Sequence, residues 1–171
     1  PDALSALAKQ AGELNKDALN SLAQQANKII EPEALNALAT EASRLDQDPL
    51  NALAEQANKI IEPDALNSLA KQAGKLNKDA LNALCKKASI LNPDALSALA
   101  KQAGELNKYA LNALAKQADR LNPDALKALA KQANKIIEPE ALNALAQQAH
   151  RLKPEALNAL CKKADRLNPD A

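Results

Sequence analysis

The sequence predicts an all-α fold, namely an α-solenoid of about eleven short helices arranged as antiparallel hairpins. Two observations lead to this prediction. Leucines recur every 15–16 residues along the whole chain, and the opening residues PDALSALAKQAGELNK recur letter for letter at 93–108. Within each period the apolar residues have the spacing of a helix. A fixed short period is typical of repeat architectures, in which one structural unit is stacked many times.

Each repeat is numbered here from its Pro, or from the residue in its place, as position 1. The residue just before position 1 is called the cap residue. Through the first nine repeats Pro starts the odd-numbered repeats and Lys or Gln starts the even-numbered ones, so the larger period is a hairpin of 30–31 residues. The repeats begin at Pro1, Lys16, Pro32, Gln47, Pro63, Lys78, Pro93, Lys108, Pro123, Pro139 and Pro154.

Each repeat carries the signals of one helix. Asn92 precedes Pro93 and Asp94, which is the order of a favoured N-cap, a proline suited to the first helical position, and an acid near the positive end of the helix dipole. Positions 4, 7, 8, 11 and 14 are apolar, which is the stripe of an amphipathic helix. We therefore expect a helix over about positions 1–11 of every repeat.

The end of each helix is predicted at position 12. This position holds Gly, Asn, Asp, Ser or His, and we expect a left-handed C-terminal cap there. The Leu or Ile at position 14 is expected to fold back onto the helix end. One continuous helix is excluded because prolines such as Pro63 and Pro123 would break it.

Three junctions carry one extra residue and read NKIIEP. They lie at 27–32, 58–63 and 134–139. The second isoleucine of each junction, Ile30, Ile61 or Ile137, takes the place of the usual capping residue. We expect this side chain to pack into a groove between helices.

Composition limits the classes of function. The chain of 171 residues has one Tyr and no Phe, Trp or Met, and its 22 basic and 21 acidic residues give a net charge of +1. This balance argues against nucleic acid or anionic lipid as a partner. No apolar run is long enough to cross a membrane, so no membrane insertion is expected. No linker divides the chain, and we predict a single array over 1–171 that is a segment of a longer array.

Asn at position 5 is the most regular polar feature inside the predicted helices, although Asn is a weak helix former. Its functional interpretation is a polar stripe that binds an extended ligand. Its structural interpretation, which we favour, is a ladder in which each amide bonds a neighbouring repeat. The residues are Asn20, Asn36, Asn51, Asn67, Asn82, Asn112, Asn143 and Asn158.

Positions 12 and 13 form a variable pair, which resembles the base-reading pairs of transcription-activator-like effectors. The pair is tied to its own junction, however, because Asn-Lys always precedes Ile-Ile-Glu. We therefore interpret it as turn chemistry. Two surface irregularities, Ile90 and Tyr109, mark a possible contact or isolated exposure.

The sequence shows no grouping of residues suited to catalysis, a cofactor or a metal. His150 is the only histidine and is interpreted as a cap. Cys85 and Cys161 lie five repeats apart, and we expect free, largely buried thiols rather than a disulfide. The chain is therefore predicted to be no enzyme, with no cofactor, no metal and no small-molecule substrate.

In general plan the repeat resembles tetratricopeptide and HEAT proteins, whose sequence signatures it lacks, so the resemblance implies architecture alone. The predicted function is a structural or scaffolding array that assembles end to end, with other copies of itself as its partner. The alternative is a solenoid that binds a peptide or another protein. A third and weaker alternative is a modular nucleic-acid-binding repeat.

Overall fold

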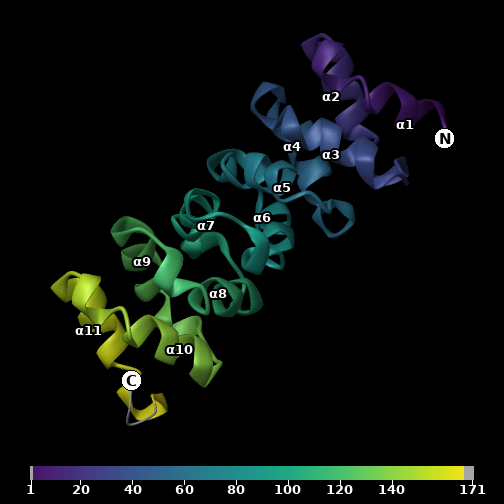
Figure 1. Ribbon diagram of the computed structural model, residues 1–171. Helices are drawn as coiled ribbons and strands as arrows, with labels where there is room; N and C mark the ends of the chain where they lie inside the picture. Colours follow the sequence, from purple (N-terminus) through teal and green to yellow (C-terminus); the bar gives the residue numbers. More distant parts are fainter. Residues whose placement is uncertain (1, 168–171) are drawn as a thin grey trace. The chain divides into compact units, whose positions relative to one another are not determined.

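The computed structural model describes residues 2–167, apart from the side chain of residue 164. Within these residues the chain forms eleven α-helices, each followed by a short 3-10 helix, and no strand (Figure 1). The predictions of an all-α fold and of a helical-repeat array are confirmed. The chain divides into two compact units, Pro1–Leu91 and Asn92–Ala171, which are described separately below.

The N-terminal unit contains six helix pairs. Its α-helices are α1 (Ala3–Ala8), α2 (Lys16–Gln24), α3 (Pro32–Thr40), α4 (Gln47–Ala54), α5 (Pro63–Ala70) and α6 (Lys78–Cys85). Its 3-10 helices are η1 (Ala11–Glu13), η2 (Ala26–Lys28), η3 (Ala42–Arg44), η4 (Ala57–Lys59), η5 (Ala73–Lys75) and η6 (Ala88–Ile90).

The C-terminal unit contains five helix pairs. Its α-helices are α7 (Pro93–Ala100), α8 (Lys108–Ala115), α9 (Pro123–Ala130), α10 (Pro139–Ala146) and α11 (Pro154–Cys161). Its 3-10 helices are η7 (Ala103–Glu105), η8 (Ala118–Arg120), η9 (Ala133–Lys135), η10 (Ala149–Arg151) and η11 (Ala164–Arg166).

The helix starts follow the predicted capping chemistry. The Asn77 side chain accepts a hydrogen bond from the Ala80 N–H at 2.9 Å, and Asn107 and Asn122 cap α8 and α9 in the same way. These bonds satisfy backbone donors that the first turn of a helix leaves free. Each of these three starts is therefore determined by residues within four positions of it, whereas α3, α4, α5, α10 and α11 have no cap hydrogen bond from a side chain.

The helix ends differ from the prediction of a left-handed cap. No described residue, glycine included, has a positive φ. The α-helix stops at about position 8, and positions 11–13 continue as a 3-10 helix: in the first repeat the Glu13 N–H donates to Gln10 O and the Leu14 N–H to Ala11 O. The chain reverses at position 14, where Leu14 is extended with φ −84° and ψ 149°. Tightening to a 3-10 turn satisfies the last carbonyls, so no left-handed residue is needed.

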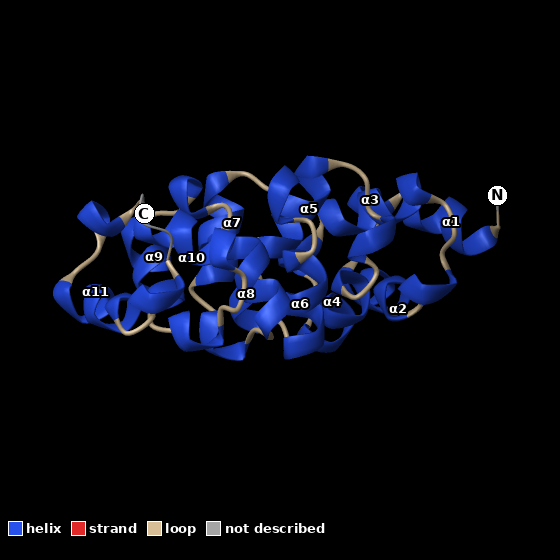
Figure 2. Ribbon diagram, turned by 90° about the horizontal axis from the view of Figure 1, so that it is seen from below, coloured by secondary structure: helices blue, strands red, loops and turns tan. Residues whose placement is uncertain are grey.

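Stacking in each unit joins every helix to the helix two further along the chain. In the N-terminal unit α1 packs on α3 and α3 on α5, while α2 packs on α4 and α4 on α6. Figure 2 shows the odd-numbered helices of this unit along one side and the even-numbered ones along the other. In the C-terminal unit α7, α9 and α11 form one row, and α8 packs on α10.

The core consists of the predicted leucines. At position 4, Leu19 to Leu142 are fully or almost fully buried in every repeat between the first and the last, and position 7 is likewise buried from Leu22 to Leu145. Alanines at positions 3, 8 and 11 allow the helices to approach closely; examples are Ala65, Ala70 and Ala73. Within the described residues, no helix is both long and apolar enough to span a membrane.

The prediction for the NKIIEP junctions is wrong for the second isoleucine. Ile30 and Ile61 are 73% and 63% exposed, and Ile137 is 46% exposed. The first isoleucine, as in Ile29 and Ile60, is fully buried instead. Because the backbone is extended here, successive side chains point in opposite directions, and burial of the first isoleucine directs the second one outward.

Candidate functional site

The residues at position 5 form a hydrogen-bond ladder between repeats. The Asn51 Oδ1 accepts a bond from the backbone N–H of Asn77 at 2.8 Å, so position 5 of one repeat reaches the cap residue of the repeat two further along. The same pattern joins Asn20 to Asp46 at 2.9 Å and Asn36 to Glu62 at 3.4 Å in the N-terminal unit. These hydrogen bonds follow the stacking direction. Each of them, called a rung here, joins one helix of a row to the next helix of that row.

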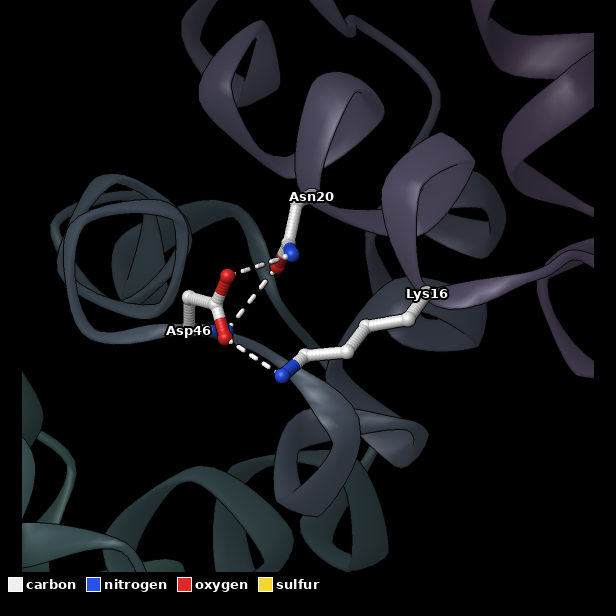
Figure 3. A network of polar contacts seen from close by, with 3 residues as sticks. All are labelled: Lys16, Asn20 and Asp46. Carbon is white, nitrogen blue, oxygen red and sulfur yellow. Dashed lines mark hydrogen bonds and ion pairs between the residues drawn. The ribbon is translucent and has the colours of Figure 1, made fainter.

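The rung between α2 and α4 is the most complete. Asn20 accepts from the Asp46 N–H through Oδ1 and donates to Asp46 Oδ2 through Nδ2, both at 2.9 Å (Figure 3). The Lys16 ammonium lies 2.7 Å from the other carboxylate oxygen. This contact with Asp46 raises the pKa of Lys16. Because the Asp46 carboxylate is used between helices, it makes no cap hydrogen bond within its own helix.

In the C-terminal unit the ladder adapts to other residues. Asn112 Oδ1 accepts from the Ile137 N–H at 3.2 Å and from the Glu138 N–H at 3.4 Å. At the equivalent place in α7, the Ser97 hydroxyl accepts from the Asn122 N–H at 3.0 Å. A short hydroxyl therefore serves the same rung as an amide.

The other predicted ladder residues have varied surroundings. Asn67, Asn82 and Asn143 each have an interaction partner, and Asn158 is exposed on α11. Asn36 and Asn112 are buried, and their Nδ2 groups have no hydrogen-bond partner among the described residues. Both face the longer Ile-Ile-Glu junctions, where the bonds to Oδ1 are also long. Ligand binding by this stripe stays a prediction.

A second set of bonds between repeats involves arginine at position 13 and was not predicted. Arg44 donates through Nη2 to the backbone carbonyl of Leu14 at 2.5 Å, while its Nη1 lies 3.2 Å from Glu41. In the C-terminal unit Arg151 reaches the carbonyl of Leu121, and Arg166 donates to that of Ile136 at 2.9 Å. The only sequence signal for these bonds was that position 13 is Arg in some repeats and Lys, Glu or Ile in the others.

A third set consists of ion pairs between position 9 and a Glu cap residue two repeats on. Lys9 Nζ lies 2.5 Å from Glu31 Oε2, and Lys116 pairs with Glu138. The hydrogen bonds to these glutamates raise the pKa of both lysines. Position 9, position 5 and the cap residue therefore lie at one edge of the contact between stacked helices.

The two cysteines differ although both occur in the sequence LCKKA. Cys85 is fully buried in α6, and burial raises the pKa of its thiol to about 12. Cys161 is also free but exposed, so the prediction of a buried thiol is wrong there. No helix is described beyond η11 that would cover this face of α11. The described residues contain no group of His, Cys, Asp and Glu that would hold a metal ion.

The two predicted surface irregularities are both exposed. Ile90 is 42% exposed and Tyr109 is 66% exposed, with the Lys108 ammonium 5.3 Å from the centre of its ring. In the N-terminal unit, Ile30, Ile61 and Ile90 all lie in segments that follow even-numbered helices. The unit thus presents exposed isoleucines at each of these junctions.

Comparison with protein-family models, with curated proteins and with solved structures gives no match for this chain. The chain is a helical-repeat protein in general plan.

Proposed function

We propose that this chain is a structural or scaffolding array without enzymatic activity, whose function is to hold stacked helices in a fixed arrangement. The observation that carries the proposal is the position-5 ladder. The side chains best placed to bind an extended ligand instead bond the backbone of the next helix in the row, as Asn20 and Asn51 do.

The arginine bonds and the ion pairs between repeats support the same function. Arg44, Arg151 and the pair of Lys9 with Glu31 each join one repeat to the repeat two further along. Bonds of this kind add stiffness between neighbours, and stability in repeat proteins depends on such neighbour interfaces. The polar residues of the repeat therefore serve the array itself.

End-to-end assembly belongs to the same proposal. Ala3 and Leu7 of α1 are exposed, whereas the residues at these positions are buried in interior repeats such as Ala34 and Leu38 of α3. A surface of the buried type left in water favours association. Because α1 and α11 present different surfaces, the contact is heterologous and propagates into filaments or rings.

Sedimentation of the 171-residue chain tests this proposal. We expect the average mass to rise with concentration, and Ala3→Glu combined with Cys161→Lys to suppress the rise. The matched control is Gln24→Glu with Gln147→Lys, which introduces the same charges at exposed positions, one in α2 and one directly after α10. A monomer at all concentrations, or equal suppression by both double variants, would contradict end-to-end assembly.

The exposed isoleucines of the N-terminal unit favour a second candidate, a scaffold that binds another protein. Ile30 and Ile61 are more exposed than isoleucines usually are. If association depends on this edge, Ile30→Ser with Ile61→Ser will suppress it while the variants of α1 and α11 leave it unchanged. That result would identify this edge as a protein-binding surface, which a second copy of the chain occupies in the isolated protein, and would replace the end-to-end contact by a lateral one.

A further inference from the structure

One rung of the ladder carries lysine at each of its polar positions. In repeat 9 the residue at position 5 is Lys127 and that at position 9 is Lys131, and the cap residue of repeat 11 is Lys153. In five other rungs position 5 accepts a hydrogen bond from the cap residue, as Asn51 does from Asn77. A lysine ammonium has no acceptor, so this rung cannot form the usual bond.

The equivalent positions in other repeats lie within ion-pair distance. Lys9 pairs with Glu31 at 2.5 Å, and Lys116 pairs with Glu138 in the row formed by α8 and α10. In the row formed by α9 and α11, the same two positions hold Lys131 and Lys153. Like charges at such places repel each other, and an anion bound beside them relieves the repulsion.

One residue of this rung, Lys131, lines a cavity. Its volume is about 340 Å³, roughly ten times the volume of a water molecule in the liquid. It opens between α9 with η9 and the end of α11, and its lining contains three lysines and a single methyl group. The lining residues are Lys131, Asn134, Ala159, Lys162 and Lys163.

Among the described residues, no acidic side chain lines this cavity. None of its three lysines has an ion pair within the part of the chain that the structure describes. Arg166, one turn beyond Lys163, adds a further positive charge and is bonded to the carbonyl of Ile136. The region therefore holds four basic side chains, with Asp165 as the acid between Lys163 and Arg166.

The chain contains an internal comparison for this site. Repeat 4 is followed by the same NKIIEP junction as repeat 9, and repeat 6 contains the same LCKKA segment as repeat 11. Helix α4 packs on α6 as α9 packs on α11. The two pairs differ at position 5, where Asn51 replaces Lys127, and at the cap residue, where Asn77 replaces Lys153. Beside the cavity they differ at position 9, where repeat 4 has Glu55 and repeat 9 has Lys131. Lys86 and Lys87 of repeat 6 thus have an acid where Lys162 and Lys163 have a lysine.

We propose that the cavity lined by Lys131, Lys162 and Lys163 is a binding site for the phosphate group of a small anionic ligand. Lysine ammonium groups bind phosphate as point charges with several donors, and Asn134 supplies an amide donor. The described lining is short, with Ala159 as its apolar residue, which favours a compact group over an extended chain. This site is independent of the proposed structural role of the array.

Calorimetric titration of the 171-residue chain with inorganic pyrophosphate at low ionic strength tests the site. We expect one pyrophosphate per chain. Lys162→Gln with Lys163→Gln should weaken binding about tenfold, because two exposed charge contacts are lost. The matched control, Lys86→Gln with Lys87→Gln, removes the same charge from the same sequence and should leave binding unchanged.

A gain-of-binding variant completes the test. Glu55→Lys places a lysine in repeat 4 where repeat 9 has Lys131, and a second pyrophosphate per chain should then bind. Equal losses in the two double variants, or no second site in Glu55→Lys, would overturn the proposal. So would binding of a ten-nucleotide single strand through Lys162 and Lys163 when pyrophosphate itself does not bind.

Discussion

The same sixteen residues occur twice in this chain, at 1–16 and at 93–108. The helix starts differ, because α1 begins at Ala3 with Asp2 as its cap whereas α7 begins at Pro93 with Asn92 as its cap, but the helix ends have the same backbone conformation. The residue after α1, Lys9, has φ −64° and ψ −20°, and its counterpart after α7, Lys101, has φ −62° and ψ −21°. Leu14 and Leu106 are both extended after a 3-10 helix. Backbone conformation in the repeat is therefore determined by local sequence.

The surroundings of the two copies differ. Leu7 is 51% exposed whereas Leu99 is fully buried. The hydroxyl of Ser97 accepts a hydrogen bond from Asn122, whereas the buried hydroxyl of Ser5 has no hydrogen-bond partner among the described residues. The stabilising contacts of a repeat thus depend on its neighbours. Variants at equivalent positions of the two copies separate the contribution of local sequence from that of the neighbouring repeats.

The largest difference is expected for the leucines at position 7. Leu99→Ala should lower the free energy of unfolding by about 2–5 kcal/mol, because it leaves a cavity in a packed core. Leu7→Ala should cost less than about 1 kcal/mol, since its side chain is already half exposed. Urea unfolding of both variants followed by circular dichroism measures this, and equal losses would mean that α1 is packed as tightly as α7.

The cysteines provide a second paired comparison, in the sequence LCKKA. At pH 8 Cys161 should react with a thiol reagent as an exposed thiol does, while Cys85 should react about 100-fold more slowly because reaction requires local opening. The raised pKa of Cys85, about 12, also keeps its thiol protonated at this pH. Since the native state then retains a proton that the unfolded state loses above about pH 9, Cys85 should make stability fall as the pH rises from about 9 to about 12.

Mass spectrometry after timed labelling assigns each modification to its cysteine, and Cys161→Ala removes the fast phase as a control. Two fast thiols in the native chain would show that α6 is not covered as the structure describes.

The serines at position 5 should differ by a smaller amount. Ser97→Ala removes the acceptor of the Asn122 N–H, and leaving that donor unpaired should cost about 1–2 kcal/mol. Ser5→Ala removes a buried hydroxyl without a described partner, so it should be neutral or slightly stabilising. The change in urea midpoint compares the two, with Ser97→Thr as the variant that retains the hydroxyl. Equal destabilisation by Ser97→Ala and Ser5→Ala would contradict the ladder.

The glycines at position 12 should show the smallest effect and the same sign in both copies. Neither Gly12 nor Gly104 has a positive φ, and a Cβ at Gly104 would meet nothing within 4 Å. A Cβ at Gly12 would lie 3.4 Å from an oxygen of Glu41, which is ordinary contact. Each Gly→Ala change should therefore stabilise by about 0.4–1 kcal/mol through the unfolded state. Destabilisation at Gly104 in thermal unfolding would instead support a left-handed cap.

The sequence by itself determined the repeat, the helix starts and the core. These features depend on residues close together in the chain: Asn122 caps the helix that follows it, and the apolar positions of one helix, such as Leu126 and Leu129, lie on one face. Local periodicity and capping chemistry act within a few residues, so both are readable without a structure.

Only the tertiary structure decided which polar groups meet. Asn51 bonds Asn77 across 26 residues, and Arg44 bonds the carbonyl of Leu14 across 30. Both contacts depend on how far one helix is shifted against the next in its row, and no local propensity contains that shift. The choice between Ile29 and Ile30 for burial likewise depended on the extended backbone at position 14, because rotation about that segment directs one side chain into the core and the next one to solvent.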